Sequence, residues 1–163
     1  SRADPGDPWA LHLVDAATGR AEPLSIGLNA AGAAWSPDGR SLAAAAQLAV
    51  RSGERSRSAV FVVDPKDPKP VKLVEHTACN SPWWASDGRI YYGAKSAMTD
   101  WTGMGPEAEN IFAVRPEPDA KPVQLTFSEL PDRDPTPSPD AKRVAFITWR
   151  TAEPRLVVMK ITR

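Results

Sequence analysis

The residue types that most often ligate metals or attack carbonyl groups are sparse in this chain. It has two histidines and one cysteine. His76 and Cys79 lie three residues apart, but a tetrahedral zinc site needs further ligands, and the other histidine, His12, is far away in the sequence. There is no G-x-S-x-G nucleophile motif and no glycine-rich phosphate loop. The sequence therefore predicts no metal, no cofactor and no catalytic residue.

A calcium loop is the second possibility, because three aspartates lie close together in DRDPTPSPD, at Asp132, Asp134 and Asp140. Their spacing departs from an EF-hand loop at two points. Pro137 stands where that loop needs glycine, and Arg143 stands where it needs a bidentate glutamate. The alternating prolines of this stretch favour an extended chain instead.

Three arginines form a basic segment around Glu54, namely Arg51, Arg55 and Arg57. Guanidinium groups bind carboxylates through paired hydrogen bonds, so this segment is a candidate for an acidic partner. The alternative is a solvated charged loop. No aromatic residues alternate with these arginines, so the segment does not resemble a nucleic-acid platform.

A second candidate binding segment is MTDWTGM, which contains Met98, Trp101 and Met104. Tryptophan is enriched at interaction hot spots, and methionine adapts to varied partner surfaces. The alternative is that Trp101 folds back and covers the edge of a sheet.

Composition sets the limits for any fold. The chain has 163 residues, 42% hydrophobic and 25% charged, with 20 basic and 20 acidic side chains. This describes one globular domain over residues 1–163 without a general attraction to nucleic acid, and no apolar run is long enough to span a bilayer. The opening residues lack the pattern of a signal peptide, and a chain that begins with Ser1 suggests a processed or trimmed product. The 17 prolines favour short strands and many turns.

A repeat organises the chain. WSPDGRSLAAAA begins at Trp35, WASDGRIYYGAK at Trp84 and PSPDAKRVAFIT at Pro137, which places turns at 36–39, 85–88 and 138–141. A second apolar signature lies between these copies, as LHLVD from Leu11, VFVVD from Val60, IFAVR from Ile111 and LVVMK from Leu156. A shorter segment follows at Pro23, Lys72 and Gln124. Four apolar segments per repeat, separated by turn signals, predict antiparallel meanders.

The repeat turn and the alanine-rich segment that follows it favour different backbone conformations. Ser36 to Gly39 fit a type I turn, with Pro37 presetting the backbone and Gly39 in the last position. We expect the third copy to tolerate Ala141 in that position. The following SLAAAAQL has the composition of a helix over Leu42–Val50, but its register matches RIYYGAK and KRVAFIT, so a strand is predicted.

On these residues the chain resembles the TolB-type (WD40-like) β-propeller repeat, whose hallmark is a W-S-P-D-G turn between the first two strands of a blade. The resemblance implies an all-β fold of four-stranded antiparallel blades. The strands then count as two, four, four and three, about three blades. That is either part of a larger propeller or half of a dimeric ring, and its open blade edges allow self-association.

In such blades the connections after the second and fourth strands lie on one face, and here they are the long ones. We predict a non-catalytic module that binds a protein partner there, through Trp101, Met98, Met104, Arg51, Arg55, Arg57 and His76. The resemblance implies a periplasmic or otherwise exported protein. Two alternatives remain open: the gating propeller of a prolyl-oligopeptidase-type serine peptidase whose catalytic domain is absent, or a propeller that binds sugar or metal at its axis.

Overall fold

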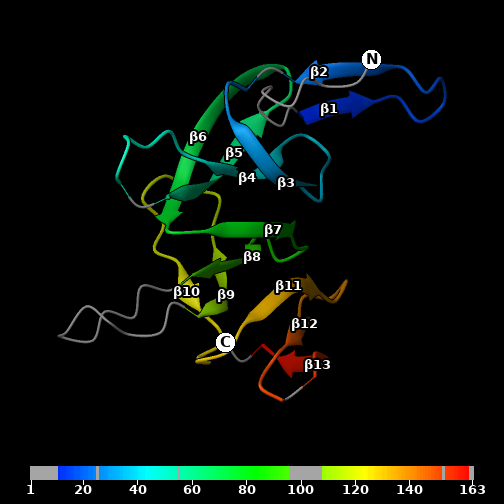
Figure 1. Ribbon diagram of the computed structural model, residues 1–163. Coiled ribbons are helices and arrows are strands. Elements are labelled where there is room, and N and C mark those ends of the chain that lie inside the picture. The colour runs from blue at the N-terminus through cyan, green and yellow to red at the C-terminus, as the bar shows by residue number, and fades with distance from the viewer. Residues whose placement is uncertain (1–10, 25, 55, 96–107, 152, 162–163) are drawn as a thin grey trace.

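The computed structural model describes residues 11–24, 26–54, 56–95, 108–151 and 153–161. Within these residues the chain forms antiparallel β-sheets and no helix. The four sheets follow one another in chain order, each stacked face to face on the next (Figure 1). The described residues contain no helix, and therefore none that could cross a membrane.

The strands divide among the sheets as the repeat predicts. The first sheet is β1 (Leu11–Val14) and β2 (Ala21–Leu24), and the second is β3 (Asn29–Trp35), β4 (Leu42–Gln47), β5 (Ser58–Asp64) and β6 (Asp67–His76). The third is β7 (Cys79–Trp84), β8 (Ile90–Lys95), β9 (Glu109–Val114) and β10 (Val123–Gln124), and the fourth is β11 (Asp132–Pro137), β12 (Arg143–Thr148) and β13 (Arg155–Lys160). The predicted all-β meander is therefore confirmed. The assignment of residues 1–163 to a single domain stays a prediction.

The alanine-rich tail is a strand, as its register predicts. The side chains of β4 from Leu42 to Ala46 are all buried, because sheets cover both faces of this strand. Ala43 and Ala45 pack against the third sheet, whereas Leu42 and Ala46 contact the cluster that includes the first sheet. Small side chains let a strand lie between two sheets, so tertiary packing overrides the helix propensity of alanine.

Apolar clusters between successive sheets form the core. Val60 and Val74 of the second sheet meet Ile90, Tyr92 and Phe112 of the third. The third and fourth sheets meet in the same way through clusters around Tyr91 and around Ile111. Each sheet thus buries its faces against its neighbours, which is the stacking of propeller blades.

The three repeat turns share one hydrogen-bonding pattern. The N–H groups of Gly39, Gly88 and Ala141 donate to carbonyl oxygens three residues earlier, at 2.9, 3.0 and 2.7 Å. All three residues have positive φ, at 68°, 79° and 50°. The last turn position therefore requires the left-handed region, which glycine adopts freely and alanine does not. The third turn tolerates Ala141, as expected, but with a backbone conformation that is unfavourable for alanine.

The segment PKDPKP is only partly a turn. The turn is limited to Pro65 and Lys66, and β6 already begins at Asp67, which pairs with Asp64. Pro68 and Pro70 therefore lie in a strand. The strand tolerates them because β6 is the edge of its sheet, where one side of the backbone has no neighbouring strand to receive an N–H.

Candidate partner-binding face

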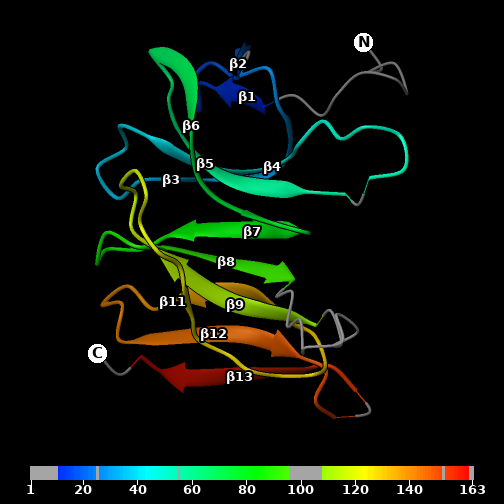
Figure 2. The ribbon, with the colours of Figure 1, turned by 90° about the vertical axis from the view of Figure 1, so that its left-hand side faces the viewer.

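The ends of β4, β8 and β12 lie on one face of the stack, seen on the right-hand side of Figure 2. We call this the long-loop face.

Hydrogen bonds also join the third and fourth sheets. The Ser81 hydroxyl donates to the Asp134 carboxylate at 2.6 Å, and the Ser86 hydroxyl donates to the Pro139 carbonyl at 2.6 Å. The tight repeat turns lie on the opposite face.

Arg51 and Arg57 lie on the long-loop face, between β4 and β5. The Arg57 guanidinium forms an ion pair with Glu75 at 2.7 Å, and Lys72 contacts the other carboxylate oxygen at 2.8 Å. The hydrogen bond from Lys72, with smaller contributions from both cations, lowers the pKa of Glu75. The backbone N–H of Arg51 donates to Glu54 at 3.1 Å. Arg57 is thus held in place, and its role in partner binding stays a prediction.

His76, at the end of β6, is occupied by contacts inside the stack. Its ring centroid lies 5.0 Å from that of Phe112 and 5.8 Å from that of Tyr92, and its Nε2 lies 3.2 Å from the Tyr92 hydroxyl oxygen. Burial lowers the pKa of His76, against a smaller opposing effect of the Lys95 backbone. These contacts give His76 a packing role between the second and third sheets.

Four of the predicted binding residues, Met98, Trp101, Met104 and Arg55, lie outside the described residues. Their predicted contribution to partner binding stays a prediction.

Cys79 is buried at the start of β7, where its Sγ lies 3.8 Å from the Ser58 carbonyl oxygen. Burial raises the pKa of its thiol to about 11, which disfavours the thiolate that binds metals. In the described part of the chain, no group of three or more histidine, cysteine, aspartate or glutamate side chains is placed to hold a metal ion.

Two apolar side chains project from the long-loop face where β10 connects to β11. Phe127 is 73% exposed and Leu130 is 48% exposed. Single exposed apolar residues are ordinary on protein surfaces, but these two lie three residues apart on one connection. Together they form the apolar centre of the candidate site.

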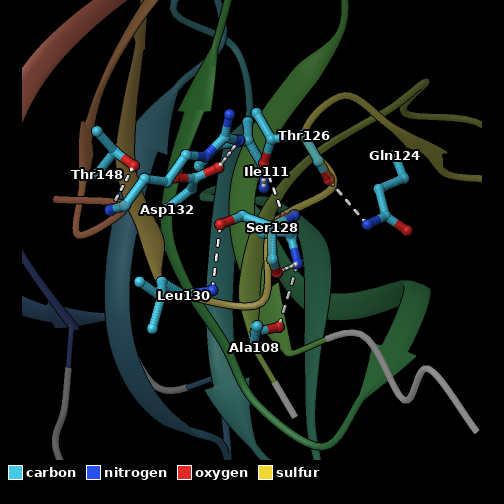
Figure 3. Close-up of polar contacts among 10 residues, drawn as sticks. Ala108, Ile111, Gln124, Thr126, Ser128, Leu130, Asp132 and Thr148 are labelled. Carbon is cyan, nitrogen blue, oxygen red and sulfur yellow. Dashed lines mark hydrogen bonds and ion pairs between the residues drawn. The ribbon is translucent and has the colours of Figure 1, made fainter. Parts of the chain in front are cut away.

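Asn110 of β9 fixes the connection that carries these two residues. Its side chain is buried, and its Oδ1 accepts hydrogen bonds from the Ser128 N–H at 2.9 Å and the Thr126 hydroxyl at 3.1 Å. Its Nδ2 donates to the carbonyl of Ser128 at 3.2 Å, and the Thr126 hydroxyl accepts from the Ile111 N–H at 3.0 Å. Figure 3 shows these bonds converging beneath Ser128. The connection is therefore preformed rather than free to collapse onto the sheet.

Two half-exposed arginines, Arg133 in β11 and Arg150 just after β12, are each held by a buried carboxylate. Arg150 contacts Asp132, which has no exposed surface, at 2.5 Å. Figure 3 shows Asp132 on the side of Thr148, across from the Asn110 contacts. Arg133 contacts the buried Glu109 at 2.6 Å. Because each charge is compensated, the arginines offer oriented N–H donors rather than a strong positive field.

The Arg133 and Glu109 pair belongs to a tightly packed group. The Arg133 guanidinium carbon lies 5.5 Å from the centre of the Trp149 ring, and Asn80 donates to the second oxygen of Glu109. A Cβ added at Gly93 would lie 2.5 Å from the Asn80 Oδ1 and 2.9 Å from a Glu109 oxygen. Glycine at position 93 is therefore required for this approach.

The sequence analysis missed Phe127, Leu130, Arg133 and Arg150. A usable signal was present in TFSELPDRD, which places a phenylalanine and a leucine in a polar segment outside the strand register. The buried residues Glu109 and Asn110 carried no such signal, because in the sequence they are two polar residues directly before the apolar segment IFAVR.

Comparison with known proteins supports the architecture. No protein-family model matches the sequence, and no curated protein matches it. Among solved structures, TolB from Acinetobacter baumannii is similar over 93% of this chain and 35% of its own, with a TM-score of 0.71 and 18% identity. The chain has the fold of a TolB-type β-propeller. This confirms the predicted resemblance at the level of the fold.

Two further solved structures share this TolB-like fold. A protein from Agrobacterium tumefaciens assigned as TolB matches 93% of this chain and 53% of its own, with a TM-score of 0.69 and 19% identity. An oligogalacturonate lyase in complex with manganese matches 94% of this chain and 46% of its own, with a TM-score of 0.65 and 12% identity. The chain therefore spans between about a third and about half of the TolB-like structures it matches.

Proposed function

We propose that this chain is a non-catalytic binding module of TolB-like propeller type, which docks a protein partner on its long-loop face. The observation that carries the proposal is the exposure of Phe127 and Leu130 on a connection that the buried Asn110 holds in place. Apolar side chains that are exposed and already ordered bind with little loss of conformational entropy.

The residues around this centre support a protein partner over a small molecule. Phenylalanine, tryptophan and arginine are enriched in protein interfaces. The segment after β12 carries Trp149 and Arg150, and the Arg133 guanidinium carbon lies 5.5 Å from the centre of the Trp149 ring. The backbone N–H of Trp149 donates to the Pro131 carbonyl at 2.9 Å, which ties this segment to the connection 125–131. We include the predicted residues Arg51 and Arg57 in the wider surface, and the predicted residue Trp101 lies outside the described residues.

Export from the cytoplasm is part of the same proposal and rests on the likeness to TolB alone. A secreted or periplasmic setting is compatible with the buried Cys79, the single cysteine of the chain, because no intrachain disulfide is required.

The test is affinity capture from an extract of the source organism, with the captured partner identified and then purified for direct binding. We expect the double variant Phe127→Ser/Leu130→Ser to bind this partner at least about tenfold more weakly, because hot-spot side chains contribute more than about 1.4 kcal/mol. Val71→Ser is the matched control, since Val71 is 50% exposed but lies in the outer strand β6.

Circular dichroism and thermal unfolding must first show that all variants fold like the wild type. Unchanged affinity in the double variant, or an equal loss in Val71→Ser, would contradict the proposed surface.

A further inference from the structure

A small pocket lies at the strand ends of the third sheet, on the face that carries the tight turns (Figure 2). It is formed between the turn that joins β7 to β8 and the connection from β9 to β10. Its volume is about 110 Å³, several times the share of one water molecule in the liquid, about 30 Å³. This four-stranded sheet and its two turns supply all the lining residues, namely Arg89, Ala113, Val114, Arg115, Lys121 and Val123.

Three of these side chains are cations, and the structure compensates their charges only weakly. The Nε of Arg89 lies 3.8 Å from Oδ2 of Asp87, close to the limit of an ion pair. The same carboxylate also accepts hydrogen bonds from the Tyr91 hydroxyl and from the Arg89 backbone N–H, both at 3.0 Å. Arg115 and Lys121 form no ion pair with any other described residue. The pocket therefore gathers N–H donors that are free to bind an anion.

The acidic side chains of the β9–β10 connection do not line the pocket. Glu117 and Asp119 are exposed and lie between Arg115 and Lys121 in the sequence, but neither belongs to the pocket lining. The connection thus places its two cations at the pocket and its two carboxylates outside it. Like charges that are held together repel one another, so an anion bound among them is stabilised.

The second sheet has a pocket in the same place, which provides an internal comparison. Its lining includes the cations Arg40 and Lys66 together with the carboxylate of Asp64. Asp64 and Arg115 occupy equivalent positions, because each directly follows the residue that the ladder pairs with the first residue of the second strand. The third-sheet pocket therefore has a guanidinium group where its counterpart has a carboxylate.

We infer that the third-sheet pocket binds a phosphate group through Arg89, Arg115 and Lys121. Guanidinium groups match the oxygen atoms of phosphate through paired hydrogen bonds, and an ammonium group adds a point charge. Val123 is 55% exposed and gives the pocket an apolar wall that suits the organic part of a phosphate monoester. The pocket lies on the face opposite the long-loop face, so the inference goes beyond the proposed partner binding and does not depend on it.

A titration of the isotope-labelled chain with inorganic phosphate, followed through the backbone amide resonances, tests this inference. Ionic strength is held constant with sodium chloride, because salt screens exposed charges. We expect saturable shifts confined to the amides around residues 88–89, 113–115 and 121–124. Chloride alone should not produce them. Shifts that do not saturate, or that spread over all basic residues, would overturn the inference.

The double variant Arg115→Gln/Lys121→Gln should bind phosphate at least about tenfold more weakly, because two of the three cations are removed. Both side chains are exposed, and circular dichroism checks that the variant folds like the wild type. Arg40→Gln removes the arginine of the second-sheet pocket and is the matched control. Unchanged affinity in the double variant, or an equal loss in Arg40→Gln, would overturn the inference.

A second titration, with phenyl phosphate, separates two sources of the phosphate group. Tighter binding than that of inorganic phosphate indicates a phosphate monoester, and equal or weaker binding indicates free phosphate. Either result supports the site, whereas the absence of saturable binding of both compounds would overturn it. Partner capture is measured on other variants, so this inference and the proposed function can fail separately.

Discussion

His76 is a half-buried imidazole that contacts the aromatic side chains Tyr92 and Phe112 of the neighbouring sheet. Desolvation lowers its pKa, so the folded protein favours the neutral ring. Desolvation also raises the pKa of the buried Tyr92, so its phenol keeps its proton at physiological pH. The pair is therefore an uncharged contact between two sheets.

This contact predicts a pH dependence of stability. Because the pKa of His76 is lower in the folded chain than in the unfolded chain, the unfolded state binds more protons as the pH falls through the ordinary histidine range near 6.5. The free energy of unfolding should therefore be lower at pH 5 than at pH 7.5, and His76→Gln should flatten that difference. Urea unfolding across this pH range measures it. The exposed His12 provides the control variant His12→Gln, and an equal flattening there would contradict the account.

The repeat turn is the element that shows how far the sequence determines local structure. The Ser36 hydroxyl donates to the Asp38 carboxylate at 2.7 Å and accepts from the Ser41 N–H at 2.9 Å. The hydrogen bond from Ser36 lowers the pKa of Asp38, and the Ser138 hydroxyl has the same effect on Asp140. The third turn keeps these side-chain bonds although Ala141 replaces glycine.

Substitution at the last turn position should change stability in opposite directions in two copies. No atom lies within 4 Å of a Cβ added at Gly39, so Gly39→Ala has only a backbone cost and should destabilise by about 1 kcal/mol. Ala141→Gly removes the strain of an alanine at positive φ and should stabilise the folded chain. The gain should be smaller, roughly 0.5 kcal/mol, because glycine also has more conformational freedom in the unfolded state. Chemical denaturation of both variants checks this. Changes of the same sign would contradict the left-handed assignment.

The sequence predicts the strands well and the site poorly, for different physical reasons. Strand positions follow from repeating turns and from register, which explains why β4 is predicted against its alanine content. The site depends on contacts between segments that are distant in the sequence, such as Glu109 with Arg133 and Asp132 with Arg150. No spacing rule indicates these pairs. His76 is a second example, since its contacts with Tyr92 and Phe112 are not apparent from the sequence, and its role in partner binding stays a prediction.

At the scale of the whole molecule, each described sheet packs its apolar side chains against those of the next sheet. The exposed Phe127 and Leu130 lie on the connection between the third and fourth sheets, so this packing determines where the proposed binding surface lies.

Hydrogen–deuterium exchange of the chain with and without its captured partner tests the proposed binding face most directly. The account predicts slower exchange over the connection 125–131 and at residues 149–151, with no change in the repeat turns at 36–39 and 85–88. Protection of those turns, with unchanged exchange across 125–131, would contradict it.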